Sequence, residues 1–406
     1  MIALTIVCAL GVCSVPAFAD PPPPEEADLT PIERLGKHIF EDKTLSRPAG
    51  VACASCHDPA QAYQGNNGSP VPALARGAPP KALGKRNTPT IMYSSFAPTF
   101  GFIDDRNEKT GAVEKIPAGG QFYDGRAVDL TSQVQGPLLD PNEMNAASTR
   151  AAVEIIRDGA YASLAREVLG EKIFDDPERA FGKLAAAVAA YESSARFHPF
   201  ASKFDDFLRG KAKLTPIEEK GFALFKDPEK GNCLACHAGM EKSHDPRDWL
   251  FTDFTYDALG APKNRMIPAT TGLGKAPDLG LCQQPGIKSA APADFDTDSL
   301  CGAFKVPTLR NVGVTGPWLH NGVFTKLRDV VAFYATRDTQ PARWYSKAKN
   351  KFDDLPSAYH NNVNVAEVPY DRKTGEKPRL DDSEVDAIVA FLETLTDRPA
   401  DYAARP

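Results

Sequence analysis

Two short stretches decide the fold of this chain: Cys53-Ala54-Ser55-Cys56-His57 and Cys233-Leu234-Ala235-Cys236-His237. Each is a C-x-x-C-H motif, in which two thiols can add to the two vinyl groups of one haem and the adjacent imidazole reaches its iron. A structural zinc site would want further Cys or His at ligand spacing, and a redox dithiol has no need of the adjacent His. Two copies therefore predict two covalently bound haem c groups, with His57 and His237 as the proximal iron ligands.

The sequence around each motif is repeated. Leu29-Thr30-Pro31-Ile32-Glu33 recurs as Leu214-Thr215-Pro216-Ile217-Glu218, and each copy predicts a helix start with Thr as N-cap, Pro first and Glu third. Each copy also closes in a similar helix, because residues 186–192 match residues 387–393 in pattern. An opening helix, a haem motif and a closing helix form the order of a small c-type cytochrome domain.

Helical periodicity recurs outside the repeats. Leu327, Val330, Val331 and Tyr334 fall on one helix face, whereas strand alternation is scarce. We expect a mainly α fold of two tandem cytochrome c-like domains, residues 29–205 and 206–400, each with one covalently attached haem. Long irregular loops are predicted between the helices, at residues 66–90 and 256–298, because these segments are rich in breaking residues or lack periodicity.

The N-terminus predicts export. An apolar run over residues 2–17 ends in Ala17-Phe18-Ala19-Asp20, which is typical of a cleaved secretory signal, although no Lys or Arg precedes the run and the true start codon stays open. We assign a signal peptide at 1–19 and a Pro-rich leader at 20–28. No other stretch predicts a membrane span, and a net charge of -6 argues against nucleic acid as a partner. A soluble periplasmic protein follows, in which Cys282 and Cys301 are predicted to form a disulfide.

Three further stretches carry a family resemblance. They are Arg86-Asn87-Thr88-Pro89-Thr90, Gln121-Phe122-Tyr123-Asp124-Gly125-Arg126-Ala127, and Thr308-Leu309-Arg310-Asn311 with Gly316-Pro317-Trp318-Leu319-His320-Asn321-Gly322. In order and spacing they resemble the signatures of the bacterial di-haem cytochrome c peroxidase and MauG superfamily, over almost the whole mature chain. The resemblance implies that hydrogen peroxide reacts at the N-terminal haem and that a periplasmic redox protein is the electron donor or the protein substrate. A homodimer is compatible with the resemblance.

The resemblance also assigns the peroxide site. Family members carry a capping His in the loop before the Arg-Asn-x-Pro-Thr stretch, but this chain has no His or Met from Asp58 to Ile91, which implies an open iron. The family's acid/base glutamate maps to Glu143, its distal glutamine to Gln133 and a pocket proline to Pro137. One carboxyl group can move the proton from one peroxide oxygen to the other, and burial in a haem pocket should raise its pKa. An exposed loop glutamate is the alternative.

At the second haem the family's methionine ligand, fourteen residues past the His of the Pro-aromatic-x-His motif, maps from His320 to Tyr334. Ordinary core packing of this tyrosine and ligation by Met266 are the alternatives. A tyrosinate favours ferric and higher oxidation states, so the second haem would share oxidising equivalents with the first.

Between the haems the resemblance places a calcium ion, held by the Asn87 side chain and the carbonyls of Thr315 and Pro317, oxygen donors that suit this ion. Ordinary turn chemistry is the alternative. Two positions depart from the pattern. The inter-haem aromatic, usually Trp, is Tyr123, and a surface Trp from which MauG-type members oxidise a protein is Gly231. The methylamine dehydrogenase precursor is therefore not expected as the substrate.

Three functions remain open at this point. The first is a MauG-like enzyme, whose peroxide-oxidised haem pair oxidises a further substrate. The second is a cytochrome c peroxidase that removes peroxide with electrons from a small cytochrome or copper protein. The third is a non-enzymatic di-haem electron-transfer cytochrome, which would require a distal ligand at the first haem that the sequence does not supply.

Overall fold

The computed structural model describes residues 26–106, 111–269, 271–346 and 351–399. The predicted signal peptide and most of the predicted leader lie outside this part of the chain. The fold is mainly α, as expected. The helices are α1 (Pro31–Glu41), α2 (Cys53–Cys56), α3 (Leu130–Leu139), α4 (Thr149–Arg157), α5 (Ala162–Leu169), α6 (Pro177–Glu192), α7 (Lys203–Leu208), α8 (Pro216–Lys226), α9 (Gly272–Lys275), α10 (Ile287–Ala290), α11 (Leu327–Thr336) and α12 (Asp382–Glu393). The strands are β1 (Gly101–Arg106), β2 (Val113–Ala118), β3 (Tyr256–Asp257) and β4 (Phe304–Lys305).

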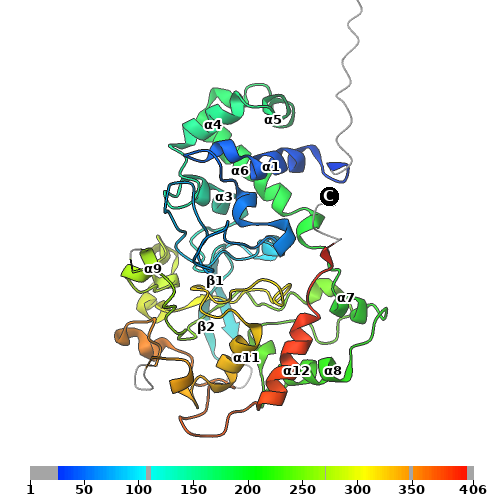
Figure 1. Cartoon of the computed structure of the whole chain (residues 1–406), viewed down its shortest axis with the longest axis vertical. Coiled ribbons are helices and arrows are strands. Elements are labelled where there is room, and N and C mark those ends of the chain that lie inside the picture. The colour runs from blue at the N-terminus through cyan, green and yellow to red at the C-terminus, as the bar shows by residue number, and fades with distance from the viewer. Residues whose placement is uncertain (1–25, 107–110, 270, 347–350, 400–406) are drawn as a thin grey trace, which may run out of the picture.

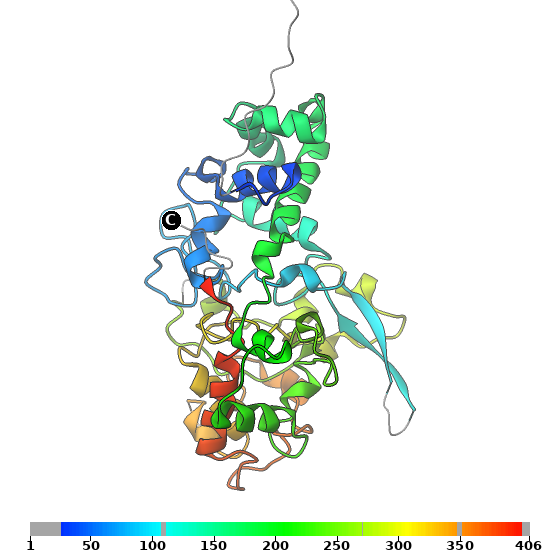
Figure 2. The ribbon, with the colours of Figure 1, turned by 90° about the vertical axis from the view of Figure 1, so that its right-hand side faces the viewer.

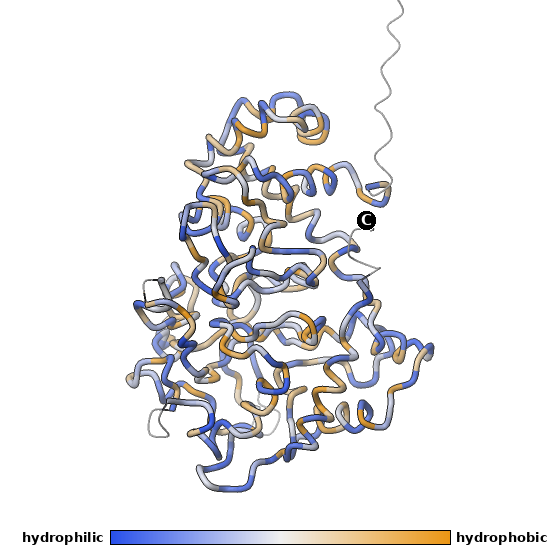
Figure 3. The backbone as a smooth tube through the Cα atoms, viewed as in Figure 1, coloured by the Kyte–Doolittle hydropathy of each residue, from blue (hydrophilic) through white to orange (hydrophobic). Residues whose placement is uncertain are grey.

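The two halves of the chain stack along the long axis of the molecule, with α1 and α3 to α6 at one end and α7, α8, α11 and α12 at the other (Figure 1). Hydrophobic and hydrophilic residues alternate along these helices, as amphipathic packing requires (Figure 3). Both predicted helix starts are confirmed. The backbone N–H of Thr30 donates to Glu33 at 2.7 Å, and that of Thr215 donates to Glu218 at 2.6 Å.

A glycine allows the opening and closing helices to touch in each half. A Cβ on Gly36 would lie 2.0 Å from the Ala187 carbonyl oxygen, where α1 crosses α6. A Cβ on Gly221 would lie 1.9 Å from the Ala387 carbonyl oxygen, where α8 crosses α12. The same crossing in both halves shows that the module is used twice. Ala187 thus corresponds to Ala387, so the structural register is one residue away from the pattern match of the sequence.

The passage from one half to the other runs through α7. Phe200 belongs to the first hydrophobic core, whereas Phe204 belongs to the second. The predicted domain boundary between residues 205 and 206 therefore falls within α7, whose first turn already packs in the C-terminal half.

A hairpin that the sequence did not predict connects the halves. Strands β1 and β2 pair antiparallel, with Gly101 opposite Ala118, and the hairpin projects from the side of the molecule (Figure 2). At its base Ala118 forms a β-bridge with Thr255, and β3 pairs with β4 beside it. The N-terminal half thus contributes a strand to the C-terminal half.

A buried polar cluster closes the interface. Arg310 and Asp205 form an ion pair at 2.7 Å, and neither side chain has exposed surface. Beside it the Tyr93 hydroxyl donates to Asp397 at 2.8 Å, and the Asn311 amide donates to the same carboxylate at 2.9 Å. Buried polar groups with complete hydrogen bonding fix a single arrangement of the parts that carry them.

Within the described residues, no helix is long and apolar enough to cross a bilayer.

Candidate active site

One interior cavity of about 800 Å³ runs between the two halves and is lined by both C-x-x-C-H motifs. The first motif forms α2 and the second begins with a 3₁₀ turn, Cys233–Ala235. All four motif thiols are free of disulfides. Cofactor sites typically enclose roughly 300–1000 Å³, so the cavity has the size of such a site.

Backbone carbonyls orient both motif histidines. The Nδ1 atom of His57 lies 3.0 Å from the Tyr63 carbonyl oxygen, and that of His237 lies 3.1 Å from the Phe251 carbonyl oxygen. A hydrogen bond from Nδ1 leaves the Nε2 lone pair for a metal. Burial lowers the pKa of both imidazoles, to about 4 for His237, and neutral imidazole is the form that binds iron. Free paired thiols and neutral, oriented imidazoles fit two c-type haems.

The residues predicted for peroxide chemistry line this cavity. Gln133 and Pro137 come from α3, and Glu143 follows in the next loop. The Glu143 carbonyl accepts a hydrogen bond from the Ala78 N–H at 2.7 Å, so the 66–90 loop supports the glutamate loop. Burial, with a smaller contribution from Asp140, raises the pKa of the Glu143 carboxyl to about 7. A carboxyl group with this pKa can accept and return a proton near neutral pH.

Two methionines that sequence reasoning did not consider also line the cavity. The Met92 sulfur lies 3.4 Å from the Asn311 amide nitrogen and accepts its hydrogen bond. Met144 is 3 % exposed and packs in the first hydrophobic core. Both side chains are thus engaged in protein contacts in the part of the chain that is described.

The two candidate ligands of the second haem differ sharply in position. Tyr334 lies on α11 and lines the cavity, and burial, followed by the charge of Cys236, raises its pKa. Met266 is 61 % exposed and lies outside the cavity lining. Tyr370, for which the sequence gave no signal, also lines the cavity, with its ring centroid 5.9 Å from that of Tyr334.

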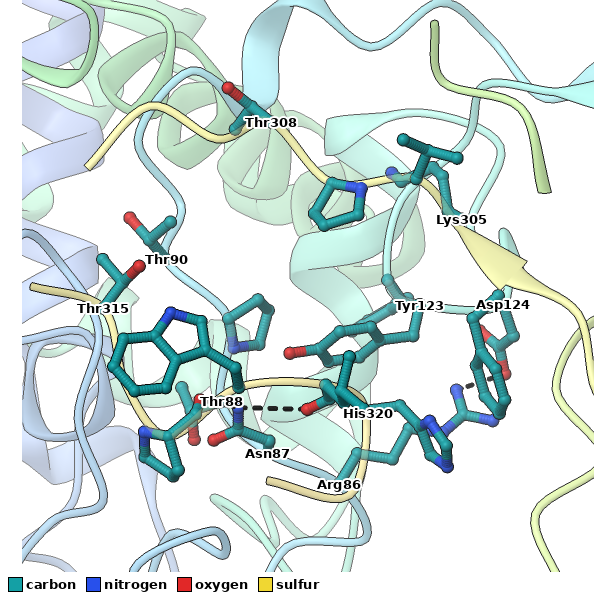
Figure 4. A pocket seen from close by; sticks show the side chains of 18 of the residues that line it. Arg86, Asn87, Thr88, Thr90, Tyr123, Asp124, Lys305, Thr308, Thr315 and His320 are labelled. Carbon is teal, nitrogen blue, oxygen red and sulfur yellow. Dashed lines mark hydrogen bonds and ion pairs between the residues drawn. The ribbon is translucent and has the colours of Figure 1, made fainter. Parts of the chain in front are cut away.

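The residues predicted to lie between the haems come together. Asn87, Tyr123 and His320 gather at one place in the cavity (Figure 4). Burial raises the pKa of the Tyr123 phenol, while the Arg86 charge and the Asn87 side chain act in the opposite direction. His320 stacks on Phe304 with ring centroids 3.7 Å apart. Its Nε2 atom lies 3.3 Å from an Asp354 carboxylate oxygen.

Two of the three predicted calcium residues, Asn87 and Pro317, are in contact there. The Asn87 amide nitrogen lies 2.5 Å from the Pro317 carbonyl oxygen and 3.3 Å from the Leu319 carbonyl oxygen, while the Asn87 Oδ1 atom is buried without a hydrogen-bond partner. Amide O and N are assigned from the hydrogen-bond network, and the exchanged orientation would bring three oxygens together. Thr315 lines the same cavity.

A charged network that the motifs did not predict surrounds Tyr123. Arg86 forms ion pairs with Asp124 at 2.6 Å and with Asp278 at 2.7 Å (Figure 4 shows the first). The Lys305 ammonium donates to the Gly120 carbonyl, and burial lowers its pKa to about 8. No spacing rule connects these positions, because Arg86 and Asp124 are distant in the sequence, and the contacts of Arg86 with Asp278 and of Lys305 with Gly120 arise only when the halves pack together.

The predicted disulfide between Cys282 and Cys301 is confirmed. It closes the loop that carries Gln284, whose amide donates to the Gly125 carbonyl of the N-terminal half at 2.8 Å, and Asp278, the partner of Arg86, lies just before that loop. The disulfide loop therefore contacts the segment that bears Tyr123 through Gly125.

Comparison with known proteins places these features in a family. The model for di-haem cytochrome c peroxidases matches residues 31–213. The methylamine utilization protein MauG of Paracoccus denitrificans is 39% identical over 367 residues, which cover 90% of this chain and 88% of that protein. The cytochrome c551 peroxidase of Nitrosomonas europaea is 29% identical over 76% of this chain and 73% of its own length. Among solved structures, the di-haem peroxidase BthA of Burkholderia thailandensis matches with a TM-score of 0.82 and 40% identity, over 91% of this chain and 86% of that chain.

Proposed function

Because the chain belongs to the di-haem cytochrome c peroxidase family, we propose that hydrogen peroxide reacts in the cavity beside His57 and that a second haem beside His237 shares the oxidising equivalents. Family membership makes the protein a haem-dependent oxidoreductase that acts with peroxide, which decides against the non-enzymatic alternative. The observation that carries the proposal is the position of Glu143. Its carboxyl, with a pKa of about 7, lines the cavity that holds the first C-x-x-C-H motif.

Each residue of the first site has its own role in the proposed reaction. Cys53 and Cys56 hold the haem, and His57 is the protein ligand of its iron. A haem held by these residues would supply the iron at which peroxide binds and the electrons that its reduction requires. The Glu143 carboxylate accepts the proton of the peroxide oxygen nearer the iron and returns it to the leaving oxygen, so no proton needs to come from solvent. Gln133 and Pro137 line the same space, where they orient the peroxide and limit access of water.

At the second site Cys233 and Cys236 hold the haem, and His237 and Tyr334 ligate its iron. Tyr334 is supported by its position in the cavity, and Met266 is disfavoured by its exposure. The buried phenol gives up its proton only where a strong positive charge stands beside it, which a ferric iron supplies. Negative charge on the phenolate oxygen favours oxidised iron, so this haem suits storage of oxidising equivalents better than electron uptake. We therefore favour the MauG-like mode over the cytochrome c peroxidase mode.

Tyr123 and His320 lie between the two sites and are proposed to mediate electron exchange between the haems. A Tyr123 radical forms only with loss of the phenol proton, because the ring is buried away from water and its pKa is raised. The exchange between the haems is therefore coupled to that proton.

A calcium ion is proposed at the junction, with the Asn87 side chain and the Thr315 and Pro317 carbonyls as ligands. The converging carbonyls and the unpartnered Asn87 Oδ1 atom support it. A hard cation of this kind takes neutral oxygens together with waters.

The predicted export of the chain, together with the disulfide, supports a periplasmic location with a redox protein there as donor or substrate. The homodimer and the domain limits at 29–205 and 206–400 stay predictions.

The test is a steady-state assay of peroxide consumption by the holoprotein with a reduced small c-type cytochrome as electron donor. Slow turnover with a persistent oxidised haem pair is expected, and fast turnover would favour the cytochrome c peroxidase mode. Failure of the holoprotein to consume peroxide, with or without donor, would overturn the assignment of the first site.

A further inference from the structure

The last residue of α6 is a glutamate in the interior. Glu192 is 4 % exposed and lines the cavity that contains the first C-x-x-C-H motif. Its Oε2 atom is buried without a hydrogen-bond partner among the described residues. A buried polar atom that lacks a hydrogen-bond partner destabilises the fold, so the presence of this carboxyl group is not explained by folding.

The duplicated module shows what folding alone requires at this position. Gly36 meets Ala187 and Tyr191 on α6, as Gly221 meets Ala387 and Phe391 on α12. In this register Glu192 corresponds to Leu392, which is 5 % exposed and lines the same cavity from the other half. The fold therefore accepts an apolar side chain here, and only the half with the proposed peroxide site carries a carboxyl group.

The carboxyl group lies close to the haem attachment residues. After burial, the charge of Glu192 is the largest cause of the raised pKa of Cys53. Cys53 is the proposed attachment point of the first haem, and Glu192 lines the same cavity, which that haem would occupy.

Glu192 is held neutral near pH 7, because burial raises its pKa to about 8 and no other cause contributes. Other ionisable groups lie in the cavity and on the elements packed against α6. They include Cys53, Cys56, His57, Lys85, Arg86, Tyr93, Tyr123, Asp124, Arg126 and Glu143 at the cavity, Glu33, Arg34, Lys37, His38 and Glu41 on α1, Arg150, Glu154 and Arg157 on α4, Asp175 before α6, and Glu178, Arg179, Lys183 and Tyr191 on α6 itself. Among them Lys37 is paired with Glu41, and none offsets the burial of the Glu192 carboxyl.

We propose that Glu192 is the redox-linked proton site of the first haem, which keeps its proton while that haem is reduced and releases it when the haem is oxidised. The inference rests on the proposed function for the position of that haem. In the step, one electron leaves the iron for a soluble one-electron oxidant, and one proton leaves a Glu192 carboxyl oxygen for water. Positive charge gained at the iron stabilises the carboxylate, because charges interact strongly in a low-dielectric interior.

The experiment is a potentiometric titration of the holoprotein between pH 6 and 9, read from the separate absorption changes of the two haems, without peroxide. In the wild-type protein the potential of the first haem should fall with rising pH up to about 8, the pKa of Glu192 in the reduced state, and level off above it, because oxidation releases the proton only where the reduced protein still holds it. In Glu192→Gln this component of the slope should disappear, while the second haem keeps its behaviour. Glu143 titrates in the same cavity, so the comparison is repeated in the Glu143→Gln background, where the slope due to Glu192 should remain.

Two controls separate this role from a structural one. Glu192→Leu copies the residue of the other half, so it should fold, attach both haems and lose the pH slope as Glu192→Gln does. Glu393→Gln changes the exposed neighbour of Leu392 and should leave both potentials unchanged. Infrared difference spectra should show a protonated carboxyl band that diminishes on oxidation of the wild-type protein and is absent from Glu192→Gln. An unchanged slope and band in Glu192→Gln would overturn the proposal, and this result would stand whether or not the protein consumes peroxide.

Discussion

At the scale of single residues, the proposed chemistry of each site depends on one side-chain oxygen. Glu143 holds a carboxyl oxygen in the first site, and its pKa of about 7 places the change of charge within the physiological range. Its partner in function, Tyr334, offers a phenol oxygen to the second site. Both oxygens come from side chains that the cavity removes from water.

Replacement of Glu143 by Gln should slow the reaction with peroxide by about a hundredfold or more, the usual effect of losing a general acid/base. The carboxylate is the proton acceptor, so the wild-type rate should rise with pH through about 7, and the rate of Glu143→Gln should lose this rise. Stopped-flow mixing of the ferric protein with peroxide at several pH values measures both effects. Unchanged rates would remove Glu143 from the mechanism.

Replacement of Tyr334 by Phe should leave both haems attached, because their thiols are untouched. The phenolate oxygen is lost while the packing of the ring remains, so the spin state of the second haem should change in the ferric absorption spectrum and any persistent oxidised state should shorten. Met266→Leu is the matched control and should alter neither, since its side chain is 61 % exposed outside the cavity. The opposite pattern would assign the ligand to Met266 and would favour the cytochrome c peroxidase mode.

At the scale of elements, three features could be predicted: the helix starts, the duplication and the cavity face of α11. Each depends on residues that are close together in the sequence. Thr30 and Thr215 cap their helices as the spacing indicated. The alignment of the two closing helices could not be predicted to the residue, because an Ala-rich segment aligns about equally well after a shift by one residue. Only the contacts of Gly36 and Gly221 decide which residues correspond. The β1–β2 hairpin was missed because both strands are largely exposed and lack alternating burial, and the Arg86 network was missed because its partner Asp278 lies in the other half.

The disulfide loop is an element whose effect on stability can be measured. Cys282 and Cys301 are 19 residues apart, so the bond restricts the unfolded chain by about 3 kcal/mol in the loop-entropy model. The double variant Cys282→Ser/Cys301→Ser should lower the free energy of unfolding by about that amount, with haem content unchanged. Denaturant titration of the holoproteins gives the difference. An equal effect of reductant on the wild-type protein and the variant would show that the bond is not the cause.

At the scale of the whole molecule, the interface between the halves depends on a charge pair without access to water. Asp205→Asn leaves Arg310 buried and uncompensated, which should destabilise the protein by about 3–5 kcal/mol. The neighbouring Asp206 pairs with Arg398 nearer the surface, so Asp206→Asn should cost about 1 kcal/mol or less. Thermal unfolding of the two variants provides the comparison, and equal losses would contradict the role given to the buried pair.

The proposed calcium ion also belongs to this scale, because Asn87 comes from one half and Pro317 from the other. Chelation should lower the unfolding temperature of the holoprotein, and readdition of calcium should restore it. Asn87→Ala should remove this response, because one of its oxygen ligands is lost. A wild-type unfolding temperature that does not respond to the chelator would exclude the site.

The contact between Tyr93 and Asp397 also orders the steps by which the protein matures. The two residues lie 304 positions apart in the sequence, so the ribosome has to deliver nearly the whole chain before the buried hydroxyl meets its partner. Both C-x-x-C-H motifs line the cavity that this late contact helps to enclose. We therefore expect covalent attachment of the haems to take place on the open, newly made chain, before the two halves assemble.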